Sequence, residues 1–156
     1  MTSQVSDVPA GFRPIPLFQA SDFIGFNGPL YLQHEVIDGR TQVRVGFRVE
    51  RRHCNPMGVC HGGMLATFCD MLLPLSIHRL NQDVAGRFLP TINLQLDYMA
   101  PAPLGAWVQG QAEVLRVTRT MVFSQGIVSA DGTPAVRVSA IFKIGAPFVP
   151  PREPIG

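Results

Sequence analysis

The sequence predicts an α+β fold in which a curved antiparallel sheet of about six strands wraps around one long buried helix. Six short segments alternate apolar and polar residues with a period of two, as half-buried strands do. One longer segment, from His61 to about Leu80, is apolar nearly all round and must be enclosed by other structure. No helical pattern separates the last four strands, so we expect them to form an antiparallel meander.

The chain has 156 residues, which is enough for one domain to bury a core without disulfides. Its composition is that of a globular protein, with 46% hydrophobic and 15% charged residues. Prolines concentrate at the two ends and at the turns. We therefore predict an N-terminal arm over residues 1–20, a single domain over 21–146 and a proline-rich tail over 147–156.

Charge and cysteine content indicate the compartment and narrow the partners. Three cysteines, an odd number, suit a reducing compartment better than a disulfide framework. The N-terminus has neither the basic start nor the apolar stretch of a signal peptide, and the apolar run from Gly62 to Ile77 is too short to cross a bilayer. The net charge is +2, and the basic residues are scattered, unlike the stripe typical of nucleic-acid binding. We expect a cytoplasmic protein that binds neither membrane nor nucleic acid.

The first two strands form a predicted hairpin. The run from Pro29 to Val36 precedes the pair Asp38-Gly39, and in residues 41–49 valine and phenylalanine alternate with other residues. Alternation on both sides of an Asp-Gly turn is typical of a β-hairpin.

The long helix and four further strands follow. Pro74 is expected to kink the helix or disturb its hydrogen bonds. In the strand over residues 91–98, Tyr98 and the apolar side chains should face one way and Thr91 the other. The remaining strands are predicted over residues 106–117, 120–130 and 135–144, with an Asp-Gly turn at 131–132.

Asp70 stands in the most apolar stretch of the chain, directly after Phe68 and Cys69. An unpaired carboxylate is costly to bury, so Asp70 must have a partner, border a cavity or take up a proton. Two interpretations stay open: a catalytic carboxylate, or a structural group bonded to a neighbouring chain at an interface.

The predicted helix begins at His61-Gly62-Gly63, after a turn formed by Pro56 and Gly58. Paired glycines let a ligand approach the backbone closely, and Gly63 is the expected substrate-binding position. A helix start also offers unpaired N–H donors, which can stabilise the oxyanion formed when a carbonyl is attacked. The alternative is that the glycines only allow close packing against the sheet.

The combination of these features resembles a known family. The run Asn55-Pro-Met-Gly-Val-Cys-His-Gly-Gly63, followed after six residues by Asp70, resembles the signature of hotdog-fold acyl-CoA thioesterases of the PaaI-like (phenylacetic-acid-pathway) group. The segment Tyr98-Met-Ala-Pro-Ala102 with Leu104-Gly105 is similar to the strand-to-loop segment of that family. The resemblance runs from roughly Phe23 to Ile144 and implies the hotdog fold and hydrolysis of an acyl-coenzyme A thioester.

The resemblance also implies roles for single residues. The Gly62 N–H would polarise the thioester carbonyl, with Asn55 near the same oxygen. Asp70 would act as general base on a water or attack the carbonyl directly. Thr91 would position the water, and His61 would shape the start of the helix. No cofactor or metal is implied, because coenzyme A is part of the substrate.

Helix geometry by itself predicts a dimer if both groups are catalytic. Gly62 and Asp70 are eight residues apart, which is roughly 12 Å along a helix. A general base must lie within roughly 3 Å of its proton or one water further away. One chain therefore cannot easily supply both groups to one carbonyl, and an antiparallel partner helix would have to bring its own Asp70 opposite Gly62. The resulting homodimer has two shared sites, and whether dimers pair into a homotetramer stays open.

Two other functions remain to be separated from thioester hydrolysis. Hotdog hydratases and dehydratases add or remove water at a carbon–carbon double bond with a histidine and a carboxylate, and an Asp followed closely by His is missing from this helix. A binding module that senses acyl-CoA without hydrolysing it would gain nothing from Asp70. The acyl group is not predicted, because the candidate lining residues are equally compatible with core: Phe23, Phe26, Met64, Phe68 and Phe88.

Three further sets of residues have a simpler interpretation than a site. A zinc site is disfavoured because its four candidate ligands lack the close paired spacing of structural zinc sites: His53, Cys54, Cys60 and His61. Cys60 or Cys69 as a nucleophile would need a nearby base or helix start to lower the thiol pKa. Coenzyme A phosphates could be met by arginines, although solvated arginines are common on strands: Arg44, Arg48, Arg51, Arg52, Arg116 and Arg119.

Overall fold

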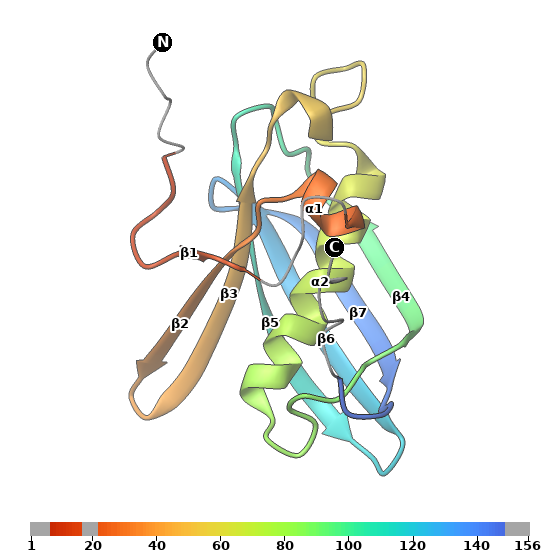
Figure 1. Cartoon of the computed structure of the whole chain (residues 1–156). Helices are drawn as coiled ribbons and strands as arrows, with labels where there is room; N and C mark the ends of the chain where they lie inside the picture. The colour runs from red at the N-terminus through yellow and green to blue at the C-terminus, as the bar shows by residue number, and fades with distance from the viewer. Residues whose placement is uncertain (1–6, 17–21, 149–156) are drawn as a thin grey trace, which may run out of the picture.

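A seven-stranded sheet curves around one long helix, α2 (Gly62–Leu80), in the computed structural model of the chain, which describes residues 7–16 and 22–148 (Figure 1). Every pair of neighbouring strands is antiparallel, so the predicted α+β architecture is confirmed. The sheet order is β1-β2-β3-β5-β6-β7-β4. The strands are β1 (Arg13–Pro14), β2 (Tyr31–Ile37), β3 (Arg40–Arg48), β4 (Thr91–Tyr98), β5 (Trp107–Val117), β6 (Met121–Ala130) and β7 (Thr133–Lys143).

The strand beyond the expected six is β1, which lies in the predicted arm. Its two residues pair with β2 in the register Arg13↔Leu32. Two residues, one of them a proline, carry too little alternation to be recognised as a strand. The rest of the predicted arm and tail falls partly outside the described residues.

Both predicted Asp-Gly hairpins are confirmed. Asp38 and Gly39 have φ angles of 50° and 73°, and Asp131 and Gly132 have φ angles of 46° and 83°. Positive φ at two consecutive residues is the requirement of the tight turn whose twist matches that of paired strands. Aspartate tolerates this region better than most residues, and glycine adopts it without a steric penalty.

The predicted meander of the four later strands is correct for three of them and wrong for β4. Strands β5, β6 and β7 follow one another as hairpins, but β4 pairs with β7 at the sheet edge and β5 pairs with β3. Periodicity identifies a strand but not its neighbour. Since β3 bonds to β5, one continuous sheet can wrap the helix from both sides (Figure 1).

The core forms where α2 lies against the concave face of the sheet. Phe68 of α2 packs against Phe47 of β3 with ring centroids 5.0 Å apart, and both side chains are fully buried. Leu72 lies over Gly110 of β5, where an added Cβ would sit 2.3 Å from the Leu72 Cδ2. The absent side chain at Gly110 therefore lets the helix approach the sheet closely.

The helix is not enclosed all round, contrary to the expectation from its composition. One stripe at three- and four-residue spacing is exposed or half-buried in the single chain, because the sheet does not cover it, and most of its residues are small or polar. α2 also continues through Pro74 to its end, although a proline there leaves the Asp70 carbonyl without its usual helical donor. The stripe comprises Gly63, Ala66, Thr67, Asp70, Met71 and Pro74.

A β-bulge reverses the predicted orientation of Thr91. The register of β4 on β7 shifts between Thr91, which pairs with Phe142, and Asn93, which pairs with Ile141. Because Phe142 is fully buried on the inner face, Thr91 opposite to it also faces the helix. The extra residue in the bulged strand is Ile92, which is 51% exposed. Strict alternation had placed Thr91 on the outer face.

The short helix α1 (Phe23–Asn27) was not predicted from the sequence. The Arg52 guanidinium donates hydrogen bonds to the carbonyls of Phe26 and Gly28 and so holds α1 against η1, a 3-10 turn over Arg51–His53. Of the phenylalanines considered as pocket or core, only Phe68 is buried; the others are exposed by more than half: Phe23, Phe26 and Phe88. Met64 is also buried. No helix within the described ranges combines the length and the hydropathy needed to cross a membrane.

Candidate active site

His61 caps the start of α2. Its Nδ1 accepts the Gly63 N–H at 2.8 Å, and its carbonyl oxygen accepts the N–H groups of Met64 and Leu65 at 2.9 Å and 3.1 Å. The Gly62 N–H, at the first helical position, donates no hydrogen bond within the part of the chain that the structure describes. A free donor at the positive end of a helix is suited to a developing oxyanion.

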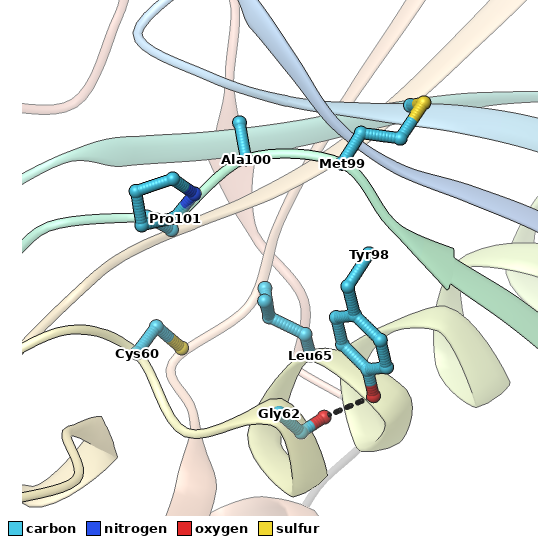
Figure 2. Close-up of a pocket in the computed structure, with 8 residues that line it drawn as sticks. Cys60, Gly62, Leu65, Tyr98, Met99, Ala100 and Pro101 are labelled. Carbon is cyan, nitrogen blue, oxygen red and sulfur yellow. Dashed lines mark hydrogen bonds between the residues drawn. The ribbon is translucent and has the colours of Figure 1, made fainter.

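Tyr98, the last residue of β4, holds the same turn from the sheet side. Its hydroxyl donates a 2.7 Å hydrogen bond to the Gly62 carbonyl oxygen, as Figure 2 shows. Burial raises the pKa of the Tyr98 phenol, with smaller contributions from Cys69 and Cys60, so the group stays a neutral donor at physiological pH. The sequence places Tyr98 in the family-like segment but does not identify it as a site residue. Its position in the alternation of β4 could have identified it, since Tyr98 ends a strand whose apolar residues face the helix.

A pocket of about 340 Å³ opens beside this turn. Its far wall is the segment that follows β4, which passes over the start of α2 (Figure 2). Gly62, whose backbone N–H donates no hydrogen bond among the described residues, is part of this wall, and most of the other lining residues are apolar. The lining residues are Cys60, Gly62, Leu65, Tyr98, Met99, Ala100, Pro101 and Ala102.

Asp70 and Thr91 form the second part of the candidate site. The Thr91 hydroxyl donates to the Asp70 Oδ1 at 2.7 Å, across 21 positions of sequence. Asp70 is half-buried rather than enclosed, so its second oxygen can be reached from the uncovered stripe of α2. A carboxylate in so apolar a stretch is expected to need a partner. That hydrogen-bond partner of Asp70 is the Thr91 hydroxyl, which the bulge in β4 turns toward the helix.

The single chain does not bring the two parts together. Gly62 and Asp70 lie on the same helix, eight residues apart, which corresponds to roughly 12 Å. Gly63 is exposed on the same stripe as Asp70.

Asn55 shapes the loop before the helix. Its Oδ1 accepts the N–H groups of Met57 and Val59 at 3.0 Å and 3.4 Å, and its backbone N–H donates to the Val59 carbonyl at 2.9 Å. The side-chain amide nitrogen has no hydrogen-bond partner among the described residues. This nitrogen is thus the donor that Asn55 can still offer to a ligand.

His53 and the buried cysteines have structural positions. The His53 Nδ1 accepts the Glu50 N–H at 3.0 Å, so its Nε2 carries the proton and donates to the Asn27 carbonyl at 2.8 Å. Burial lowers the His53 pKa, and it raises the thiol pKa of both Cys60 and Cys69 to about 12. Such thiols are poor nucleophiles at neutral pH. Among the described residues, no three potential ligands gather to hold a metal ion.

Known proteins are similar to this chain in sequence and in architecture. A family model described as Thioesterase superfamily matches residues 57–136. The "putative esterase" of Pseudomonas aeruginosa is 27% identical over 138 residues, covering 88% of this chain and 98% of the relative. Acyl-coenzyme A thioesterase 13 of Mus musculus is 27% identical over 78 residues, which is 50% of this chain and only 54% of the mouse protein.

Two solved structures show the same fold. A hypothetical thioesterase protein from Streptococcus pneumoniae, solved with coenzyme A, has a TM-score of 0.63 at 19% identity, covering 80% of this chain and 96% of its own. A mutant of the phenylacetic acid degradation protein PaaI from Thermus thermophilus has a TM-score of 0.62 at 20% identity, covering 78% and 97%. Since the family model matches more than half of the chain, this protein belongs to the thioesterase superfamily, and it has the hotdog fold of its solved neighbours.

Proposed function

We propose that this protein hydrolyses acyl-coenzyme A thioesters to the free acid and coenzyme A. The observation that supports this most directly is the arrangement of α2, which offers a free N–H at Gly62 and a carboxylate at Asp70 held by Thr91. The choice of thioester rests on the relatives: one is named an acyl-coenzyme A thioesterase, and one neighbour was solved with coenzyme A.

The electrophilic half of the proposed site is the start of α2. The Gly62 N–H donates to the thioester carbonyl oxygen and stabilises the negative charge that develops there. The free amide nitrogen of Asn55 is the proposed second donor to that oxygen. His61 and Tyr98 hold the peptide groups around Gly62, so the donor is oriented before the substrate arrives. Gly63 has no side chain to obstruct the approach.

The nucleophilic half is Asp70. Its Oδ1 accepts the Thr91 hydroxyl, which leaves Oδ2 to take a proton from an attacking water as general base. In the other route Oδ2 attacks the carbonyl carbon, and water then hydrolyses the resulting mixed anhydride. In both routes the carbon–sulfur bond breaks and the coenzyme A thiolate leaves.

Because the two halves are roughly 12 Å apart on one helix, the proposed site needs two chains. Two surfaces of the single chain support a dimer: the uncovered stripe of α2, and β4, which is an edge strand with one side unpaired. An antiparallel pairing of the two α2 helices sets the partner's Asp70 opposite Gly62 and creates two equivalent sites. A homotetramer made of two such dimers would keep both.

The arginines fall into two groups as candidates for the coenzyme A phosphates. Three are already engaged within the chain: Arg44 with Glu35 and Gln33, Arg48 with Gly105, and Arg52 with Glu50. The remaining candidates have no side-chain hydrogen bond or ion pair among the described residues, and they could form bidentate phosphate contacts: Arg51, Arg116 and Arg119.

Release of free thiol from a panel of acyl-coenzyme A substrates tests the proposal. Asp70→Asn should lower kcat by about a hundredfold or more with folding retained. Gly62→Pro should lower it comparably, because proline removes the N–H yet fits the first helical position and the extended conformation of His61 before it. Gly62→Ala is the matched control, since its Cβ would meet Tyr98 at an ordinary 3.5 Å and its N–H remains.

Two results would contradict the proposal. An Asp70→Asn variant with near wild-type turnover would remove the mechanism. A wild-type protein that releases no thiol from any acyl-coenzyme A would remove the substrate class. A crotonyl-type thioester belongs in the panel, because hydration of its double bond leaves the thiol bound whereas hydrolysis frees it.

A further inference from the structure

Cys54 and Cys60 lie directly opposite each other on two antiparallel segments that precede α2. Their thiols are free, and Cys60 lines the pocket beside Gly62. Two backbone hydrogen bonds flank the pair, one on each side: Asn55 N–H to the Val59 carbonyl at 2.9 Å, and His61 N–H to the His53 carbonyl at 2.8 Å.

This hydrogen-bond pattern sets the distance between the two cysteines. When the bonds join the residues on either side of a pair, the pair itself is non-hydrogen-bonded, with Cα atoms about 4.5 Å apart and side chains on the same side. Disulfides need Cα separations of about 4.4–6.8 Å and Cβ atoms that face each other. Cys54 and Cys60 meet the backbone requirement for a disulfide without any displacement of the chain.

The surroundings of the three cysteines favour disulfide formation between Cys54 and Cys60 over a bond that involves Cys69. Cys54 is half-buried and can be reached by a small molecule, whereas Cys60 is only 5% exposed. A hydrogen bond of 2.8 Å from the Cys60 N–H to the Ala102 carbonyl fixes the second segment in place. The third cysteine, Cys69, is fully buried inside α2 and has no cysteine opposite it.

We infer that Cys54 and Cys60 form a dithiol site that a small-molecule disulfide, such as oxidised glutathione, converts to an intramolecular disulfide. The Cys54 thiolate attacks one sulfur of the small disulfide, forms a mixed disulfide and releases one thiolate, which takes up a proton. Cys60 then loses its proton and attacks the Cys54 sulfur, displacing the second small thiol. Two protein thiols are oxidised, and one external disulfide is reduced to two thiols.

The second step is the slow one. Burial raises the thiol pKa of Cys60 to about 12, so little of it is thiolate at neutral pH. Below that pKa, the thiolate fraction of Cys60 rises about tenfold for each unit by which the pH is raised, and the closing rate should rise with it. At neutral pH a mixed disulfide on Cys54 should accumulate before the intramolecular bond forms.

The bond would close a short ring around residues 55–59. This turn contains Asn55, and the residue after Cys60 is the helix cap His61. Oxidation would thus restrict the loop next to the start of α2 and change the pocket wall that Cys60 contributes. The inference concerns thiol chemistry and holds whether or not the protein hydrolyses acyl-coenzyme A.

The positions of the methionines allow a direct test in the wild-type protein. After incubation with oxidised glutathione, the free thiols should fall from three to one per chain, with no glutathione retained at the end point. Cyanogen bromide cleaves after methionine, and Met57, Met64 and Met71 place each cysteine in a different fragment. Mass spectrometry without reductant should show fragment 2–57 linked to fragment 58–64, and fragment 65–71 free. Slower amide exchange at Val59, reversed by dithiothreitol, is the expected structural readout.

Matched variants define the controls. Cys69→Ala should form the same bond as wild type, and Cys60→Ala should stop at a stable mixed disulfide on Cys54. A bond that includes fragment 65–71, a bond between two chains, or three thiols that persist at pH 9 would overturn the inference. So would a closing rate that is independent of pH, because the buried thiol would then not be the attacking group.

Discussion

The Tyr98 hydroxyl donates a hydrogen bond of 2.7 Å to the carbonyl oxygen of Gly62, and through this bond the end of β4 holds the first turn of α2. The peptide between Gly62 and Gly63 is therefore held at both ends, since the Gly63 N–H is bonded to His61 Nδ1. The neighbouring Gly62 N–H is left free in a fixed orientation. Orientation set before binding is what makes such a donor effective for a developing oxyanion.

Removing this hydroxyl should lower turnover more than substrate binding. We expect Tyr98→Phe to lower kcat about fivefold to tenfold with little change in KM, because one hydrogen bond of about 1 kcal/mol no longer positions the donor. Steady-state thiol release measures both constants. Tyr31→Phe is the matched control and should leave kcat unchanged, since Tyr31 of β2 packs against Trp107 of β5. An unchanged kcat in Tyr98→Phe would contradict the positioning role.

The Thr91 hydroxyl should affect kcat through its hydrogen bond to Asp70. Thr91→Val keeps the shape and removes the donor, and a hydrogen bond to a charged group contributes about 1.5–3 kcal/mol, so kcat should fall about tenfold or more. Thr91→Ser restores the hydroxyl and should recover most of the activity. Thr41→Val, on an exposed position of β3, controls for the loss of a strand threonine. Equal activity of the Val and Ser variants would show that the contact has no catalytic role.

Loss of the helix cap at His61 should lower the free energy of unfolding as well as the rate of turnover. His61→Ala leaves the Gly63 N–H without its acceptor, which should lower the free energy of unfolding by about 1 kcal/mol. His61→Asn offers a side-chain oxygen at the same place and should retain most of that stability. Urea unfolding of the three proteins gives the comparison. Identical unfolding curves for wild type and His61→Ala would argue against a capping role.

A shared active site predicts complementation between two inactive variants. In a mixed dimer of Asp70→Asn and Gly62→Pro, one site combines the intact Gly62 of the first chain with the intact Asp70 of the second. The purified mixed dimer, coexpressed with two different tags, should have about half of the wild-type activity, because one of its two sites is whole. If both groups acted within one chain, the mixed dimer would be as inactive as its parents.

The free energy of unfolding should fall as the pH is lowered through the range in which His53 and His78 take up protons. Burial lowers the pKa of His53 and of His78 below 6.5, so the unfolded chain binds more protons than the folded one in this range. The free energy of unfolding should decrease below about pH 6.5, by up to about 1.4 kcal/mol per pH unit for each group, until the lower folded-state pKa is passed.

Urea unfolding between pH 8 and pH 5 measures this slope. In His53→Gln, whose amide can also accept from the Glu50 N–H and donate to the Asn27 carbonyl, the slope should be smaller than in wild type. A slope unaffected by His53→Gln would show that this histidine does not titrate as inferred.

The sequence by itself determined the elements of this protein. Alternation located the six longer strands to within a residue or two, and the apolar run located α2, predicted over residues 61–80 and observed over Gly62–Leu80. The Asp-Gly turns and the His-Gly-Gly helix start were also readable. All of these are local signals, because side-chain periodicity and turn conformation depend on residues only a few positions apart.

Only the tertiary structure decided how those elements meet. The place of β4 beside β7, the bulge that turns Thr91 to Asp70, and the bond from Tyr98 to Gly62 all join residues at least 21 positions apart. A one-residue slip in pairing reverses which face a side chain occupies, and nothing in the local alternation of β4 signals that slip. The geometry of the candidate site therefore follows from backbone pairing between distant strands, which the composition of any single segment does not specify.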